Sequence, residues 1–293
     1  MASFVHVDQS SFEDAFSHLR NFQLEGVFCD VTLKIHEEKD AVYSAHRVVL
    51  ASKSIYFYTM FTSGLAESRE GTITLKGVTS NAFSELVSYA YTGKVKIRPD
   101  NVEDLLDAAH MLQFEKVQDA CFDFLRNNLD CGNCIGIAYL AQKYHCRKAQ
   151  HDAEEFSRQN FRAVTKTKEY LELEVDQVAQ LVSSDELNIS HESEVYTAIT
   201  SWVKHSQGSR TKNFSQLLQH LRVPLLTRKF LIDILAKEEM IMVNTDCRRF
   251  LLEALDYHLV PERRNQSQAL KVTPREAVTR KMLVIGGESK SLC

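Results

Sequence analysis

Four candidate metal or redox ligands lie close together near the middle of the chain. Cys131 and Cys134 have the C-x-x-C spacing of a zinc site, and His145 and Cys146 follow further along. His145 and Cys146 are adjacent, and the stretch before them has the periodicity of one continuous helix, so a tetrahedral set of four ligands is hard to assemble. We therefore expect no metal and no cofactor, and interpret these cysteines as free thiols.

Cys146 is the best candidate for a reactive thiol. His145 precedes it, and Arg147 and Lys148 follow it. Positive neighbours stabilise a thiolate, which is the nucleophilic form of cysteine. Sensing of electrophiles at Cys146 is therefore an alternative to a plain structural role.

The sequence offers little for catalysis. It contains no GxSxG, HExxH, GxxxxGK[ST] or GxGxxG motif. Asp30, His46 and Arg47 combine an acid with two basic groups, and we interpret them as a hydrogen-bonded group in the core. We predict no catalytic residue and no enzymatic activity.

Length and composition predict two globular domains. The 293 residues are 44% hydrophobic and 25% charged, and the net charge is −4, which favours neither a nucleic acid nor a membrane as partner. There are seven cysteines, an odd number that suits a reducing compartment, and neither an export signal nor a membrane-spanning apolar run is visible. We expect a cytoplasmic protein, with the nucleus as a second location.

The first residues predict an amphipathic helix and a small sheet. Four apolar residues repeat at helical spacing before Gly26: Phe12, Ala15, Phe16 and Leu19. This early helix has little of its own chain to lie on, so we expect a second copy of the protein to cover it. Strands are predicted at 31–36 and 41–44, as a hairpin-like pair, and at 72–75.

The stretch 46–68 is the predicted binding surface. It contains apolar and aromatic residues at helical spacing, breaks at Gly64 and continues into Leu65, Ala66 and Glu67. A helix that ends at a glycine and then presents an apolar side chain and an acid is suited to docking another protein's helix. Three further helices end near Asn128 and complete an α+β domain over residues 1–129.

The remainder is predicted to be helical. Residues 130–261 read as antiparallel helix pairs, with Trp202 as a core anchor, and they resemble a solenoid without a strict period. Residues 262–281 are basic and read as an exposed linker, with a nuclear address or a nucleic-acid contact as the alternative. Residues 282–293 begin as a buried strand that Gly286 and Gly287 stop. Because a lone strand does not fold by itself, we expect that something after it is missing.

Several motifs in this order resemble the kelch-like family. The BTB (POZ) domain of that family resembles CDVTL at 29–33, AHRVVLAS at 45–52, YFYTMFTSGLAES at 56–68, YAYTGKV at 89–95 and AAHMLQF at 108–114. The BACK domain that follows it is similar to EVYTAITSWVKH, RVPLLT and FLLEALDYHLVPERR. KMLVIGG resembles the first strand of a kelch β-propeller blade, and the likeness covers residues 10 to 287.

The resemblance implies a non-catalytic adaptor of a cullin-3 ubiquitin ligase, in which other subunits transfer ubiquitin. The BTB domain would dimerise and bind cullin-3, and a propeller, absent here beyond its first strand, would hold the protein substrate. The family's apolar-x-Glu motif maps onto Leu65, Ala66 and Glu67, with Phe61 in the same contact patch. A groove for the cullin's N-terminal extension would lie near the first BACK helix, at Cys134, Ile137, Ala138, Leu140, Ala141 and Tyr144.

Two other function classes stay open. A BTB transcriptional regulator would recruit corepressors through its dimer groove, although no C-x(2–4)-C…H-x(3–5)-H array of zinc fingers follows. A cytoskeletal, actin-associated scaffold would use the propeller to hold filaments.

Overall fold

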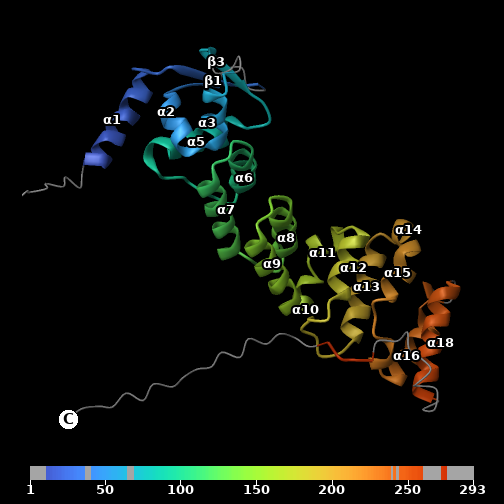
Figure 1. The fold of residues 1–293 in the computed structure, drawn as a ribbon. Coiled ribbons are helices and arrows are strands. Elements are labelled where there is room, and N and C mark those ends of the chain that lie inside the picture. The colour runs from blue at the N-terminus through green and yellow to red at the C-terminus, as the bar shows by residue number, and fades with distance from the viewer. Residues whose placement is uncertain are drawn as a thin grey trace, which may run out of the picture. The chain divides into compact units, whose positions relative to one another are not determined.

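Residues 11–36, 41–64, 69–238, 240–241, 244–259 and 272–275 are described by the computed structural model, which divides after Asn128 into two compact units (Figure 1). Three predictions therefore lie outside the described residues: the Leu65–Glu67 motif, the strand at 282–285 and most of the basic linker. None of the described helices is long and apolar enough to cross a membrane.

The first unit combines a three-stranded sheet with helices. Its elements are α1 (Ser11–Glu25), β1 (Val31–Ile35), β2 (Val42–Ala45), α2 (Arg47–Lys53), α3 (Ile55–Thr62), β3 (Thr72–Leu75), α5 (Ser80–Thr92), α6 (Val102–Met111) and α7 (Glu115–Asn127). Figure 1 shows the sheet beside the cluster of α2, α3 and α5.

The sheet follows from the alternation in β1. Val31, Leu33 and Ile35 are at most 3% exposed, whereas Thr32 and Lys34 point to the other face. The strand order is β2-β1-β3, with β2 antiparallel and β3 parallel to β1. The predicted hairpin and the predicted third strand are both confirmed.

The second unit is helical throughout its described residues. Its elements are α8 (Cys134–Lys143), α9 (Arg147–Gln159), α10 (Phe161–Val164), α11 (Lys168–Glu172), α12 (Val175–Ser183), α13 (Ser193–His205), α14 (Gln207–Arg210), η1 (Thr211–Asn213), α15 (Phe214–Leu218), η2 (Val223–Leu225), α16 (Arg228–Lys237) and α18 (Thr245–Leu259). An α+β unit followed by an all-α unit is the predicted fold class.

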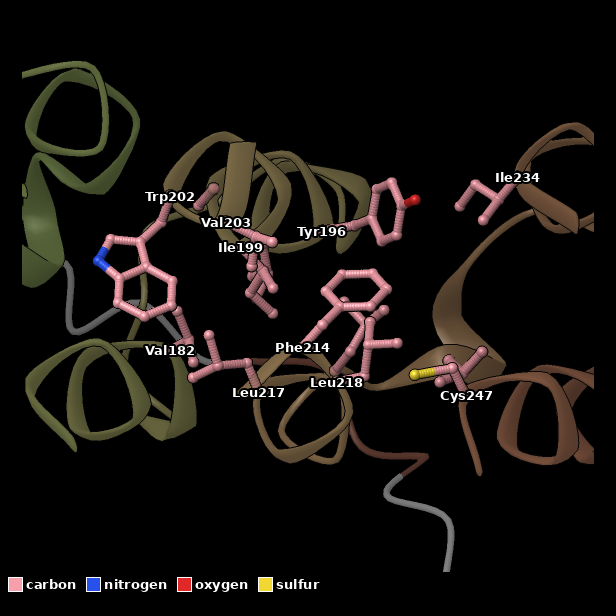
Figure 2. Close-up of a cluster of buried hydrophobic side chains, with 14 of the residues drawn as sticks. Val182, Tyr196, Ile199, Trp202, Val203, Phe214, Leu217, Leu218, Ile234 and Cys247 are labelled. Carbon is pink, nitrogen blue, oxygen red and sulfur yellow. The ribbon is translucent and has the colours of Figure 1, made fainter. Parts of the chain in front are cut away.

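Trp202 lies in the core of the second unit, as predicted. Its ring is 1% exposed, and Figure 2 shows it above Val182 and beside Val203. The indole Nε1–H donates to the Leu173 carbonyl oxygen at 2.9 Å, and the Arg210 guanidinium lies 4.1 Å from the ring centroid. A buried tryptophan needs such a partner for its N–H, so this bond fixes α13 against the end of α11.

One part of the basic segment differs from the exposed linker that composition predicts. Residues 272–275 lie on the second unit, and the Arg275 side chain is 1% exposed. It forms an ion pair with Glu192, 83 residues earlier in the chain. A basic composition predicts a solvated segment. It does not show that a buried carboxylate far away in the chain, Glu192, pairs with one of the arginines.

Candidate protein-binding surface

Ser54 divides the predicted 46–68 helix into α2 and α3. Its backbone is extended, its N–H donates to the Leu50 carbonyl oxygen, and its Oγ accepts the N–H of Phe57 at 3.1 Å. The same hydroxyl donates to the carbonyl oxygen of Leu112, at the end of α6, at 2.6 Å. Ser54 thus ends one helix, caps the next and fixes the corner between them to α6.

The outer side of α3 is an exposed apolar face. Ile55 is 55% exposed and Tyr58 is 58% exposed, and together with Thr62 they follow the i, i+3, i+7 spacing of one helix side. We call these three residues the α3 face. Phe57, on the opposite side, is fully buried. A helix that is apolar on both sides but buried on one is typical of a protein-binding element.

Phe61 lies beside the α3 face and is held from two directions. Its ring stacks on Phe57 with centroids 5.6 Å apart, and the Arg47 guanidinium lies 5.0 Å from its centroid. The Arg47 side chain donates in turn to the carbonyl oxygens of Asp30 and Glu70. Phe61 is therefore half-buried and positioned, and its predicted contact with a partner stays a prediction.

The segment that follows α3 leaves it through a left-handed residue. Gly64 has φ +73°, and nothing lies within 4 Å of where a Cβ would stand. The helix end at a glycine is confirmed. Leu65 and Glu67, the predicted anchor and acid, lie outside the described residues, so their contacts stay a prediction.

The predicted contact residues of α8 need correction. Ile137, Ala141 and Tyr144 are at most 6% exposed, and so is Cys134. Their spacing is that of the buried face of an amphipathic helix, so they are core residues and not surface ligands. Leu140 and Ala138 are half-buried, so their predicted contact with a partner stays a prediction.

The other side of α8 is accessible. Ala138, Tyr139 and Gln142 line a cleft of about 220 Å³ together with residues of α9 and α12, and Leu181 contributes to its wall. Tyr139 is 58% exposed. The sequence prediction named Ala138 but missed Tyr139, because helical spacing does not show which side of α8 is exposed.

The α1 helix contacts its own unit more than predicted. Gln23 donates to the Ser44 carbonyl oxygen at 2.8 Å, the Arg20 guanidinium lies over the Tyr91 ring, and Leu19 is half-buried. Ala15 is exposed and Phe16 is 37% exposed. The helix therefore lies on β2 and α5 and still exposes part of its apolar surface.

A groove of about 850 Å³ runs between α1 and α5, with Phe16, Arg20 and Tyr91 in its lining. Two apolar residues near the end of α1 are more exposed than Phe16: Leu24 at 67% and Phe28 at 77%. The sequence reasoning missed both. The side chain of Phe12 lies outside the described residues.

Of the three residues predicted to form one core hydrogen-bond group, only His46 is buried, whereas Asp30 is exposed and accepts the Arg47 backbone N–H at 2.7 Å on the surface. The core group instead joins His46 to Tyr91. The His46 backbone N–H donates to Tyr91 Oη at 2.8 Å, and its Nδ1 lies 2.8 Å from the same oxygen. Nε2 lies 3.0 Å from the Val27 carbonyl oxygen. The tyrosine O–H therefore donates to Nδ1, and Nε2 carries the proton. Burial raises the pKa of Tyr91 to about 12, while the hydrogen bond from His46 lowers it.

The candidate metal and thiol residues occupy different environments. Burial raises the pKa of Cys134 to about 12, with the Glu169 carboxylate adding to the effect, whereas Cys146 is half-buried at the N-cap position of α9. Within the described residues, His, Cys, Asp and Glu side chains form no group of three or more that could hold a metal ion. The reactivity predicted for Cys146 stays a prediction.

Comparisons with known proteins match both units. The model of the BTB/POZ domain matches residues 19–129, and that of BACK, "BTB And C-terminal Kelch", matches residues 134–236. Kelch-like protein 17 of Homo sapiens is 38% identical over 289 residues, and kelch-like protein 3 of Pongo abelii is 35% identical over 288. These alignments cover 98% and 97% of this chain but 44% and 49% of the relatives, so the chain spans about half their length. The solved BTB domain of zebrafish PATZ1 is 25% identical and aligns over all of its own chain and 43% of this one, with a TM-score of 0.39.

Proposed function

Because this chain belongs to the kelch-like family, with a BTB domain followed by a BACK domain, we propose that it is a non-catalytic adaptor of a cullin-3 ubiquitin ligase. Its BTB domain binds cullin-3 and a second copy of the chain. The ligase's other subunits transfer the ubiquitin. The free thiols of the described residues fit a cytoplasmic location.

The α3 face carries this proposal. Ile55 and Tyr58 are exposed on a helix that leads, through Gly64, directly into the Leu65–Glu67 motif. Tyrosine is enriched among residues that dominate protein interfaces, because it buries a large ring while its hydroxyl keeps a polar partner. The partner helix lies across the α3 face, Leu65 fills an apolar pocket, and Glu67 accepts hydrogen bonds.

A second contact lies on the BACK domain, at the cleft beside α8. The extension that precedes the first cullin helix binds the side of α8 that carries Ala138 and Tyr139, rather than the buried side that the sequence suggests. The lining of the cleft combines apolar residues such as Leu173 and Leu181 with charged ones such as Glu154 and Arg158, which suits a short peptide.

The substrate is a protein bound by a kelch propeller that would follow Ile285. This part of the proposal rests on the likeness of KMLVIGG to a blade strand and on the relatives' names. A pull-down with the complete propeller-containing protein would test it, and the absence of any captured protein that becomes ubiquitinated would contradict it.

Titration calorimetry with the cullin-3 N-terminal region tests the adaptor proposal. We expect Leu65→Asp, Glu67→Ala and Tyr58→Ala each to weaken binding by about tenfold or more, since truncating an interface anchor costs about 2 kcal/mol. Tyr139→Ala should weaken binding only when the N-terminal extension is present. Val42→Thr, at an exposed apolar residue of β2, is the matched control and should bind normally.

Two results would contradict the proposal. One is an absence of binding by a folded protein, which would favour the transcriptional-regulator class. The other is equal binding by the Tyr58→Ala and Val42→Thr variants. Thermal melting followed by circular dichroism confirms that each variant is folded.

A further inference from the structure

Residues 272–275 form a short segment of the second unit (Figure 1, red). One of its side chains, that of Arg275, is buried. The side chains of Arg275 and Glu192 are both 1% exposed. An arginine is rarely buried to this degree unless its charge and its donors are all matched. The hydrogen-bond partners of the Arg275 guanidinium therefore show whether the buried side chain occupies a matched binding site.

All five N–H donors of the Arg275 guanidinium have acceptors. Nε donates to Glu192 Oε2 at 3.0 Å, and Nη2 donates to Glu192 Oε1 at 2.8 Å, which makes the ion pair bidentate. The remaining three donors reach backbone carbonyl oxygens: Val182 at 2.7 Å, Ser184 at 2.5 Å and His220 at 2.9 Å. The fork of a guanidinium fits this arrangement, and a lysine ammonium, with three donors, does not.

Two of the three carbonyl acceptors lie at the C-terminal end of a helix, and the third lies in the turn that follows another helix. Val182 and Ser184 lie at the C-terminal end of α12, and His220 follows α15. The last carbonyl oxygens of a helix have no partner inside the helix and carry its partial negative charge. A buried cation at this position satisfies them and also neutralises Glu192.

The second unit also contacts the backbone of the segment. Arg222 is 2% exposed, and its Nη1 donates to the Thr273 carbonyl oxygen at 2.6 Å. Its Nη2 pairs with Asp185, and its own backbone N–H donates to Glu192 Oε1 at 2.9 Å. Arg275 thus reaches from the segment into the helical part of the unit. Arg222 reaches in the opposite direction, from the helical part to the backbone of Thr273.

We propose that the second unit carries an arginine-peptide binding site and that residues 273–275 of the same chain are its ligand. We call Glu192, Arg222 and the three carbonyl oxygens the arginine socket. Pro274 restricts the preceding residue to extended conformations. An extended peptide can be bound through the Thr273 carbonyl oxygen and the Arg275 side chain at the same time.

Limited proteolysis with trypsin tests the proposal on the full chain. Trypsin must bind the Arg275 side chain in its own pocket, so cleavage after Arg275 requires release from the socket. We expect Glu192→Gln and Arg275→Lys, which keeps a trypsin site, to speed that cleavage by about tenfold or more, because charge-assisted hydrogen bonds are lost. Arg228→Ala, at an exposed arginine of α16, is the control and should leave the rate unchanged.

Chemical rescue separates occupation of the socket from general loss of folding. Arg275→Ala should melt at a lower temperature, and millimolar methylguanidinium should raise its melting temperature, whereas methylammonium should not. The unaltered protein should respond to neither compound. Equal effects of the two compounds, or equal cleavage after Arg275 in the unaltered and Glu192→Gln proteins, would overturn the proposal. Protection from trypsin that disappears on dilution would overturn its same-chain part, since another copy would then supply the arginine.

Discussion

Tyr91 shows how one hydroxyl can hold a buried histidine in place. It accepts the His46 backbone N–H and donates to His46 Nδ1, both at 2.8 Å. Tyr91→Phe removes both bonds and leaves two buried polar groups without this partner. We expect the free energy of unfolding to fall by about 1–3 kcal/mol, measured by urea denaturation.

The matched control is Tyr58→Phe, at an exposed tyrosine, which should change stability by less than about 0.5 kcal/mol. The pH dependence adds a second check. The pKa of Tyr91 rises from an ordinary value of 10.0 to about 12 in the folded protein, so the unfolded state loses this proton first. Tyr91's contribution to stability is therefore present below pH 10 and falls as the pH approaches 12. A Tyr91→Phe variant with unchanged stability would contradict this account.

The cysteines should differ in reactivity according to their burial. Burial raises the pKa of Cys121 and Cys134 to about 12 and that of Cys247 to about 11. At about pH 8 these three thiols are protonated and covered, so alkylation by iodoacetamide should reach Cys146 well before them. Peptide mass spectrometry measures the rates, with the urea-unfolded protein as the control in which they converge. Labelling of Cys134 as fast as Cys146 would contradict the prediction.

At the scale of elements, a carboxylate from another helix caps α8. The N-cap residue Asn133 makes no side-chain cap, while Glu169 of α11 accepts the N–H groups of Gly136 at 2.6 Å and Ile135 at 3.3 Å. Glu169→Ala leaves these first-turn donors without an acceptor, and we expect a loss of about 1–2 kcal/mol in urea denaturation. Glu172→Ala, at an exposed acid of the same helix, should have little effect.

The negative charge of Glu169 and its acceptor oxygens have different effects on the stability of the folded protein. Burial raises the pKa of this carboxyl, although the two backbone hydrogen bonds lower it. A raised pKa means that the folded state binds the proton more tightly than the unfolded state, so ionisation reduces the stabilisation that is present at low pH. Glu169→Gln keeps one acceptor oxygen, for the shorter bond from Gly136, and replaces the other oxygen by a donor, so it should lose less stability at pH 7 than Glu169→Ala. A loss equal to that of Glu169→Ala would contradict the view that an acceptor for Gly136, rather than the charge, is the main contribution.

Elements whose apolar period matches one buried face were predictable from the sequence. The alternation in β1 and the helical repeat at Phe83, Leu86, Val87 and Ala90 of α5 are examples. Ser54 was not predictable as a break, since its hydroxyl bonds to Leu112, 58 residues later. The same limit applies to α8, because periodicity identifies Ile137 and Ala141 as one face of a helix without showing whether that face meets the core or a partner. Arg275 was missed because its acceptors lie far away in the chain.

At the scale of the whole molecule, we expect a dimer formed through α1. Ala15 is exposed within each chain, so Ala15→Asp leaves the folded chain undisturbed but places an unpaired charge in a buried interface, which costs several kcal/mol. Light scattering at micromolar concentration should give twice the 33.5 kDa chain mass for the unaltered protein and the mass of one chain for the variant.

Ser17→Asp adds the same charge to another side of the same helix and should remain dimeric. A single-chain mass for the unaltered protein would exclude the dimer, and an Ala15→Asp variant that stays dimeric would place the interface elsewhere, with the exposed Leu24 and Phe28 as the next residues to change.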